Sequence, residues 1–311
     1  MSSTPLSLYR LCRFPAVFTA LADICAAFLL THRDWQPGTE FAALLVASAG
    51  LYLSGMVFND VFDRHVDLKE RPQRPIPSGQ VSLPFAILFG SGLMLTGLIA
   101  AAFAGKFSLL VALALCAAIF LYNGLLKKTP IGPVSMGLCR FLNILLGASS
   151  AATVVSDLWA LPQIWYAGAM GVYITGVTLF AKREAEGARI SSLLPGLIVI
   201  DLGLGMLAVW IGGLLPSWGI PMPPGKFQPP EPMFFLLGAI ALTINRRAIN
   251  ALSKPSPGMI QMAVGAMLLS VISLNAMVIY LYRGPEALNY ALITLALVIP
   301  ATVLRRWVSM T

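Results

Sequence analysis

The stretch that decides how this chain folds and where its chemistry lies reads Asn59-Asp60-Val61-Phe62-Asp63-Arg64-His65-Val66-Asp67. It places three carboxylates and an amide at the end of an apolar stretch, in a chain with only 13 acidic residues. If the segment is helical, these four side chains are spaced three or four residues apart and share one face. Like charges this close repel unless divalent cations lie among them, and hard oxygen ligands with an open face suit Mg²⁺ shared with a substrate phosphate. The segment therefore predicts a magnesium site.

Basic side chains follow the carboxylates at once. Lys69, Arg71 and Arg74 lie in a proline-rich stretch that ends Ile76-Pro77-Ser78-Gly79. Their cations offset the same anion that the metal would hold. The two stretches together predict a site for a phosphate-bearing ligand.

The composition predicts a membrane protein. Hydrophobic residues make up 58% of the chain, charged residues 11%, and the mean hydropathy is +0.81, which lies outside the range of soluble domains. A membrane-spanning helix needs roughly 17–25 apolar residues. Runs of this kind occur at ten places, near 14–31, 41–60, 84–104, 107–124, 133–155, 162–181, 192–214, 233–252, 257–281 and 287–304.

The basic residues predict the orientation of these spans. With the N-terminus in the cytoplasm, sixteen of the 21 Lys and Arg residues fall in inside segments, four fall outside, and Arg140 lies within a span. Cytoplasmic loops carry an excess of Lys and Arg, so this division supports ten spans with both termini and the charged loops in the cytoplasm. The net charge of +8 is thus explained by topology and not by nucleic-acid binding. We expect a multi-pass protein of the bacterial inner membrane.

The acidic segment resembles the first aspartate motif of the UbiA superfamily of intramembrane prenyltransferases. That motif is written NDxxDxxxD and is followed by an RP-x-x-SG-like loop, here Arg74-Pro75-Ile76-Pro77-Ser78-Gly79. The resemblance covers about residues 8–282, and its combination of features is most similar to the EboC-like branch. It implies an all-α bundle of nine transmembrane helices around a central cavity, formed by 1–311 as a single domain. The run 287–304 would add a tenth helix at the C-terminus.

The second acidic motif of the resembled family is weakened in this chain. The corresponding stretch runs Phe180-Ala181-Lys182-Arg183-Glu184-Ala185-Glu186-Gly187-Ala188-Arg189 and contains no aspartate. Glu184 stands at the first acidic position, Ala188 stands at the second, and Glu186 lies between them. The resemblance therefore implies a metal shell with fewer acids than the family uses.

Further candidates lie between the two motifs. The resemblance implies that Tyr122 and the lysines Lys127 and Lys128 face the diphosphate, although lysines at a helix end also satisfy the positive-inside pattern. Arg140 lies one to two turns into a span, where an arginine is costly unless it is paired or faces water. We expect a site role for Arg140, with a structural arginine as the alternative.

The resemblance implies Mg²⁺-dependent transfer of a polyprenyl group from a prenyl diphosphate to an aromatic or other lipophilic acceptor. The tail of the donor would run between helices among membrane lipids. The implied metal ligands are Asn59, Asp60, Asp63, Asp67 and Glu184. The implied catalytic residues are Asp60, Asp63, Asp67, Lys127 and Arg140, and the implied diphosphate-binding residues are Asn59, Arg71, Arg74, Tyr122, Lys128, Lys182 and Glu184.

Two other classes of function stay open from the sequence. A transporter would also carry charged residues within spans, as Asp23, Arg140 and Asp201 do, but it would not need the acidic cytosolic segment. A prenyltransferase-like scaffold that has lost catalysis and binds or hands over an isoprenoid or aromatic intermediate would fit the weakened second motif. An intact diphosphate pocket favours the enzyme, and an occluded one favours the scaffold.

Overall fold

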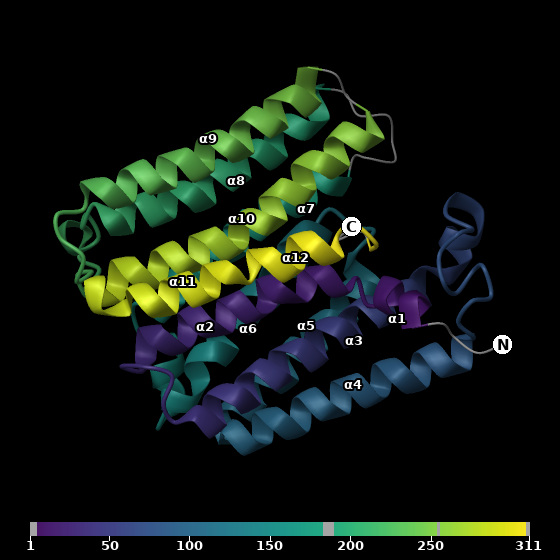
Figure 1. The fold of residues 1–311 in the computed structure, drawn as a ribbon, viewed down its shortest axis with the longest axis horizontal. Helices are drawn as coiled ribbons and strands as arrows, with labels where there is room; N and C mark the ends of the chain where they lie inside the picture. Colours follow the sequence, from purple (N-terminus) through teal and green to yellow (C-terminus); the bar gives the residue numbers. More distant parts are fainter. Residues whose placement is uncertain (1–4, 183–189, 254–255, 309–311) are drawn as a thin grey trace.

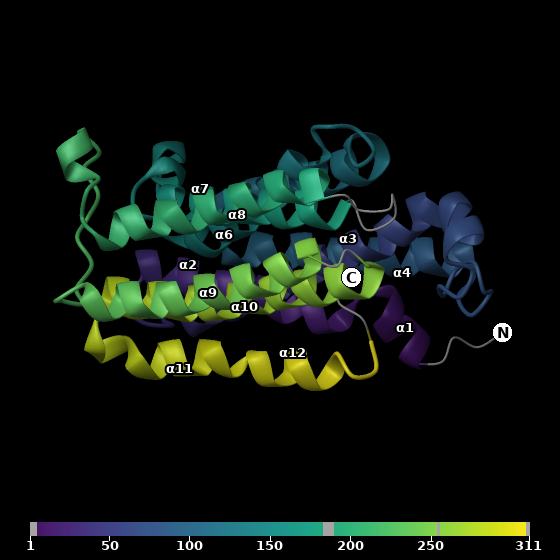
Figure 2. The same cartoon turned by 90° about the horizontal axis from the view of Figure 1, so that it is seen from above.

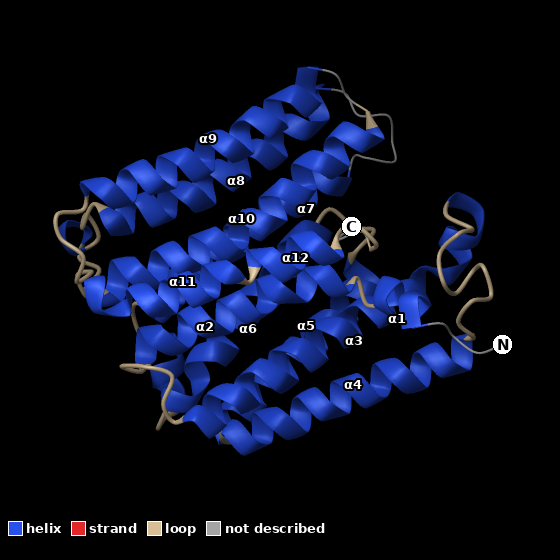
Figure 3. Ribbon diagram, viewed as in Figure 1, coloured by secondary structure: helices blue, strands red, loops and turns tan. Residues whose placement is uncertain are grey.

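The computed structural model describes residues 5–182, 190–253 and 256–308, and in this part of the chain helices joined by loops make up the fold, with no strand (Figure 3). The α-helices are α1 (Pro5–Leu11), α2 (Val17–Thr31), α3 (Gly38–Glu70), α4 (Leu83–Ala104), α5 (Lys106–Leu121), α6 (Gly132–Ala148), α7 (Gln163–Lys182), α8 (Ile190–Ile211), α9 (Glu231–Ser253), α10 (Pro257–Arg283), α11 (Leu288–Ala296) and α12 (Val298–Leu304). Short 3₁₀ turns join several of them, and η2 (Tyr122–Leu126) is a π-helical turn.

Ten helical segments in the described residues are long and apolar enough to cross a membrane. Nine of them begin and end within four residues of the apolar runs predicted from the sequence. The prediction of ten spans and of an all-α bundle is confirmed.

The second span is the exception, because α3 is 33 residues long and continues through the acidic segment to Glu70. The run predicted near 41–60 therefore ends ten residues before its helix does, and the loop begins only at Arg71. No glycine or proline interrupts residues 56–71, and Pro72 then disfavours a helical conformation for the residue before it. Arg71 accordingly leaves the helix with φ −141° and ψ 59°. The continued helix places the carboxylates on a rigid support.

The helices run roughly alongside one another in several layers (Figures 1 and 2). The segment Phe14–Thr31, which contains α2, is 78% buried, whereas α9 and the segment Pro285–Leu304 are each 22% buried. Thus α2 lies inside the bundle, and α9, α11 and α12 lie at its edge. The C-terminal pair α11 and α12 packs as an outer layer against α10 and α2.

The tenth span is broken into α11 and α12 near Pro300. A proline has no N–H to donate to the carbonyl four residues earlier, so the helical ladder is interrupted there. At the break, Leu297 donates instead to the Thr294 carbonyl over 3.2 Å, a tighter turn than the α-helix makes.

Candidate active site

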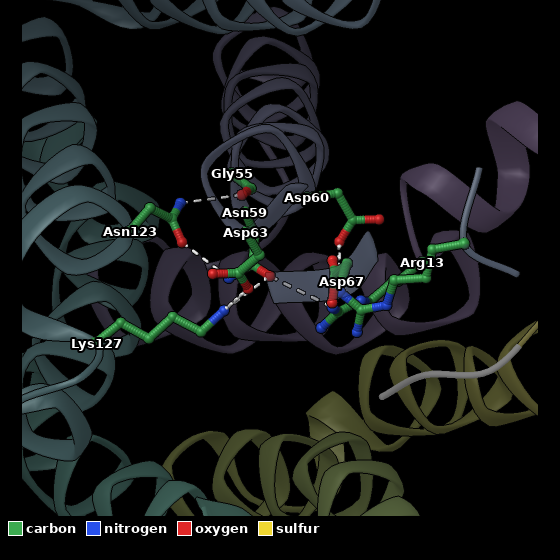
Figure 4. A network of polar contacts seen from close by, with 9 residues as sticks. Arg13, Gly55, Asn59, Asp60, Asp63, Asp67, Asn123 and Lys127 are labelled. Atoms are coloured by element: carbon green, nitrogen blue, oxygen red, sulfur yellow. Dashed lines mark hydrogen bonds and ion pairs between the residues drawn. The ribbon is translucent and has the colours of Figure 1, made fainter. Parts of the chain in front are cut away.

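The acidic segment of α3 forms one side of a polar network that we call the mouth network (Figure 4). Its members are Arg13, Asn59, Asp60, Asp63, Asp67, Arg74 and Lys127. Asp60 and Asp67 are buried, while the side chain of Asp63 keeps 14% of its surface exposed. Helical spacing brings these side chains together, as the sequence predicts.

One half of the mouth network centres on Lys127. Its ammonium donates to Asn59 Oδ1 over 3.1 Å and forms an ion pair with Asp63. The π turn η2 positions this lysine, because the Lys127 N–H donates to the Tyr122 carbonyl five residues earlier. Such π turns are frequent at functional sites.

Asn123, on the same π turn, sets the orientation of the Asn59 amide. Asn59 Nδ2 donates to Asn123 Oδ1 over 2.9 Å, and Asn123 Nδ2 donates in turn to the Gly55 carbonyl over 3.2 Å. With its nitrogen held in this way, Asn59 directs its oxygen toward Lys127. Two acceptor oxygens, from Asn59 and Asp63, therefore converge on one cation.

The other half of the mouth network centres on Arg74. Its Nη1 lies 3.2 Å from Asp60 Oδ1 and 2.7 Å from Asp67 Oδ2. Arg13 reaches the same place from the N-terminus, with Nη2 3.4 Å from both Asn59 Oδ1 and Asp60 Oδ1. Arg13 has φ 46° and ψ 48°, a left-handed conformation that is uncommon for a residue other than glycine. The strained backbone directs its side chain into the site.

The donor set of the mouth network fits Mg²⁺ in its chemistry, because it consists of carboxylate and amide oxygens. In the described residues, no three acidic, histidine or cysteine side chains gather closely enough to hold a metal. The side-chain oxygens instead form two sets, the Asp63 carboxylate with the Asn59 amide and the Asp60 carboxylate with that of Asp67, and each set already holds a protein cation. The predicted ligand set thus stays a prediction, and its members lie where a divalent cation would replace Lys127 or Arg74.

A cavity of about 430 Å³ opens beneath the mouth network. Most of the site residues predicted from the sequence line it, namely Asn59, Asp63, Arg71, Arg74, Tyr122, Lys127, Arg140 and Lys182. Asp60 and Asp67 are not in this lining and contact the site through Arg74. Lys128 is exposed and is also outside the lining, and Glu184 lies outside the described residues.

Burial lowers the pKa of Lys127, and attraction to Asp63 offsets part of that change. A lysine in such a place loses its proton more readily than one in water, unless an anion lies beside it. The pair with Asp63 therefore favours the charged form of Lys127 where the cavity meets the mouth network.

A second group of polar side chains, the buried network, lies deeper in the bundle. Asp23 is fully buried and accepts hydrogen bonds from Arg140 Nη1, from Asn143 Nδ2 over 3.0 Å and from Asn275 Nδ2 over 3.0 Å. Five helices contribute side chains to it, namely α2, α3, α6, α7 and α10. Its members are Thr19, Asp23, Ser48, Arg140, Asn143, Tyr166 and Asn275.

The structure adds four residues that sequence reasoning did not place in the site. Arg13 and Asn123 complete the mouth network, Asp23 pairs with Arg140, and Tyr52 lines the cavity. A signal existed for Asp23, since it is an acid inside a span. Tyr52 had none, because an isolated tyrosine in an apolar run is indistinguishable from a packing residue.

Comparison with known proteins gives the same family as the sequence motifs. A model of the UbiA prenyltransferase family matches residues 20–258. The digeranylgeranylglyceryl phosphate synthase of Metallosphaera sedula is 36% identical over 113 residues, which are 36% of this chain and 40% of that protein. The enzyme of the same name from Methanoculleus marisnigri is 28% identical over 220 residues, covering 56% of this chain and 75% of that protein. The chain spans about two fifths of the length of the first curated relatives that it matches.

Solved structures share the fold. A UbiA homolog from Archaeoglobus fulgidus bound to GPP and Mg²⁺ has a TM-score of 0.58 at 16% identity, over 93% of this chain and 99% of that one. The apo UbiA homolog from Aeropyrum pernix K1 has a TM-score of 0.56 at 16% identity, over 94% and 98%. At such identities the likeness is one of architecture.

Proposed function

The chain belongs to the UbiA prenyltransferase family, and we propose that it transfers a polyprenyl group from a prenyl diphosphate to a lipophilic acceptor within the membrane. One observation carries the proposal. The side-chain oxygens of Asn59 and Asp63 converge on the Lys127 ammonium at the opening of a cavity. The same cavity is lined by four more cations, from Arg13, Arg71, Arg74 and Lys182. A group of cations that lines a largely apolar cavity is what a diphosphate with a long apolar tail requires.

We assign the binding of the diphosphate to the cations of the opening. Arg71 is half-buried and forms no ion pair within the described part of the chain, and Lys182 donates to the Thr129 carbonyl over 3.0 Å. Neither has a carboxylate partner among the described residues, so both are available to an anion. Lys127 and Arg74 then exchange their carboxylate partners, Asp63 and Asp60, for the bound diphosphate.

When Lys127 and Arg74 move toward the diphosphate, the side-chain oxygens that they contacted become free to bind Mg²⁺. A bound Mg²⁺ would neutralise charge on the leaving diphosphate. Asn59, Asp60, Asp63 and Asp67 are the described residues that would hold it, and Glu184 is the predicted further ligand. Asn123 would keep the oxygen of Asn59 directed at the metal. The apolar cavity walls exclude water while the allylic C–O bond ionises, and Tyr122 offers an aromatic face in the cavity lining.

The curated relatives and the sequence motifs of this chain suggest different classes of acceptor. The name of the relatives describes a glyceryl phosphate product, while the sequence-based assignment to the EboC-like branch leaves an aromatic acceptor open. This chain matches only part of the length of these relatives. We therefore carry over the prenyl transfer and not the acceptor.

We further propose that the mouth network faces the cytoplasm of a bacterial cell, with both termini on that side. The alternation of basic loops supports this orientation. A reporter that is active only on the outer face, fused after Thr311, should stay inactive. If the reporter were active, the segment Pro285–Leu304 would not cross the membrane, and the chain would have nine crossings.

The transfer is tested with purified protein in lipid nanodiscs. Farnesyl and geranylgeranyl diphosphate are supplied with and without Mg²⁺ together with a panel of aromatic and glycerol-phosphate acceptors, and diphosphate release is measured. We expect Mg²⁺-dependent release that Lys127→Met lowers about a hundredfold, because one charge-stabilising contact is lost. Lys106→Met, a lysine at the opposite end of the fourth span, is the matched control.

A scaffold without catalysis is the second candidate, since every carboxylate of the mouth network already has a protein cation as partner. Binding of farnesyl diphosphate without release by any acceptor would favour the scaffold. Failure to bind either diphosphate would reject both functions.

A further inference from the structure

An acidic side chain lies on the outer surface of a membrane span, away from the cavity. Asp201 belongs to α8 and is exposed. It follows Leu193, where the apolar segment of α8 begins, by eight residues, or about 12 Å at 1.5 Å per residue. A carboxylate at that depth lies within the hydrocarbon, and an aspartate is too short to reach the membrane surface. Asp201 therefore needs a partner at its own depth.

Within the described residues, the partner of Asp201 is an amide. Asn245 on α9 donates through Nδ2 to Asp201 Oδ1 over 2.8 Å and to the Ala241 carbonyl over 3.0 Å. Both N–H groups of Asn245 are thus used, and the oxygens that remain on the two side chains are acceptors. Asp201 forms no ion pair with any described residue. The two side chains together present a negative charge that a cation would complement.

A cation of matching depth lies on the neighbouring helix. Arg246 directly follows Asn245, so the two differ in depth by about 1.5 Å. Arg246 is exposed and, like Asp201, forms no ion pair among the described residues. Successive residues on a helix point about 100° apart, and Asn245 is directed at α8. Arg246 is therefore directed outward, away from Asp201 of the same chain.

Two copies of the chain would bring these charges together. A twofold axis along the membrane normal leaves every residue at its own depth and places α8 of one copy opposite α9 of the other. Asp201 of each copy then faces Arg246 of the other copy. The same surface patch serves both copies, and each ion pair compensates two charges that lipid would leave unpaired.

The shape of the surface beside these charges also suits a second copy. Gly205 lies one turn from Asp201 toward the loop 212–230, and a Cβ added to it would meet nothing within 4 Å. Leu242 lies three residues from Asn245 toward the same loop and is 70% exposed. In the dimer, Leu242 would occupy the open space over the second copy's Gly205, and small residues allow such close approach in membranes. Apolar side chains alone would suit lipid equally well, so the charges decide for protein.

We propose that the protein forms a symmetric dimer in the membrane through the lateral surface of α8 and α9, with Asp201 of each copy paired with Arg246 of the other. No residue of these two helices lines the cavity, and they lie at the edge of the bundle opposite α4 (Figure 1). The dimer therefore leaves both mouth networks open. The inference does not depend on the proposed transfer.

The dimer is measured by energy transfer between full-length chains fused to a donor or an acceptor fluorescent protein. The two pools are reconstituted together in liposomes, and the transfer is followed as lipid is added. We expect the wild type to associate. Asp201→Lys and Arg246→Asp should each weaken association at least about tenfold, because each places two pairs of like charges in the interface. Arg247→Asp, the same change at the next position of α9, is the matched control and should associate like the wild type.

A mixture of Asp201→Lys and Arg246→Asp chains separates pairing between chains from pairing within one chain. In the mixed dimer the introduced lysine meets the introduced aspartate, and the remaining Asp201 meets the remaining Arg246. We expect the equimolar mixture to recover most of the wild-type association. An ion pair confined to one chain would give no such recovery, and that outcome would overturn the inference.

Gly205→Leu tests the same surface without a change of charge, and it decides the matter if the charge variants do not fold. The open space over Gly205 accommodates the side chain in a single copy, whereas in the dimer it would collide with Leu242 of the second copy. Association should fall at least about tenfold, with the melting temperature in detergent unchanged. A monomeric wild type, or undiminished association of Gly205→Leu or of folded Asp201→Lys, would overturn the dimer and leave the prenyl transfer standing.

Discussion

The mouth network and the buried network join the same chemical groups, carboxylates with guanidinium or ammonium cations and amides, in two different surroundings. At the mouth, Asp63 and its partner Lys127 keep 14% and 28% of their side-chain surface exposed. In the buried network, Asp23 has none and Arg140 has 8%. Water and ligands reach both members of the first pair, whereas in the second pair Arg140 borders the cavity and Asp23 is sealed from it.

This difference in access separates two roles. A cation bound to a partly exposed carboxylate can leave for an incoming anion, because water solvates both groups during the exchange. A carboxylate sealed among five helices cannot lose its partner without bearing an uncompensated charge. We therefore expect the mouth network to govern ligand binding and the buried network to govern stability.

The largest effect is expected from Asp23→Ala. It would leave Arg140 charged and unpaired inside the bundle, which costs about 3–5 kcal/mol of unfolding free energy. Replacing both partners, in the double variant Asp23→Leu with Arg140→Leu, should recover most of that loss. Reversible unfolding in detergent micelles measures both, and equal loss in the single and double variants would show that the pair itself is not what Asp23 contributes.

Asp63→Ala should have the opposite profile. We expect Mg²⁺-dependent binding of a prenyl diphosphate analogue to fall by about 3–4 kcal/mol, since a charge-stabilising contact is removed, with no loss of expression or thermal stability. Removing one of several neighbouring like charges relieves repulsion in the helix. Asp34→Asn, at the other end of the bundle between α2 and α3, is the control. Retained Mg²⁺-dependent binding in Asp63→Ala would mean that Asp63 is not a ligand of the metal.

The sequence predicted the bundle, and it predicted that the acidic side chains at the end of α3 lie close together, because both follow from local patterns. Apolar runs and basic loops fix the spans, and residues three or four apart on one helix, such as Asn59 and Asp63, must lie together. The extent of α3 was missed because hydropathy falls at residue 60, although no helix-breaking residue follows before Pro72.

Contacts between distant segments lay beyond sequence reasoning. Arg140 and Asp23 are 117 residues apart, and neither spacing nor periodicity links them. The same holds for Asn123, which meets Asn59 across 64 residues. The division of the carboxylates between Lys127 and Arg74 likewise depends on how α3, η2 and the segment 71–82 pack.

Glu184→Gln asks whether the mouth network has a member beyond the residues that the structure describes. The sequence places Glu184 where the family has an acidic ligand, two residues after Lys182. We expect diphosphate release from geranylgeranyl diphosphate to fall by about 2–3 kcal/mol in activation free energy, with stability unchanged. Turnover equal to that of the wild type would confine the metal shell to α3.

The smallest effect is expected from Ala188→Asp, which restores the second acid of the weakened motif. Residue 188, like Glu184, lies outside the described residues, so the expectation comes from the spacing of four between the two positions. A carboxylate added to an incomplete shell should keep or tighten Mg²⁺ affinity by about threefold, because oxygen ligands of Mg²⁺ beyond the essential ones replace water that already binds well. Calorimetric titration with Mg²⁺ in the presence of a donor analogue measures the change, with Ala188→Asn as the uncharged control. Weaker affinity in Ala188→Asp than in Ala188→Asn would mean that the position does not face the metal, and that the protein cations of the mouth network replace the missing acid's part in binding the diphosphate.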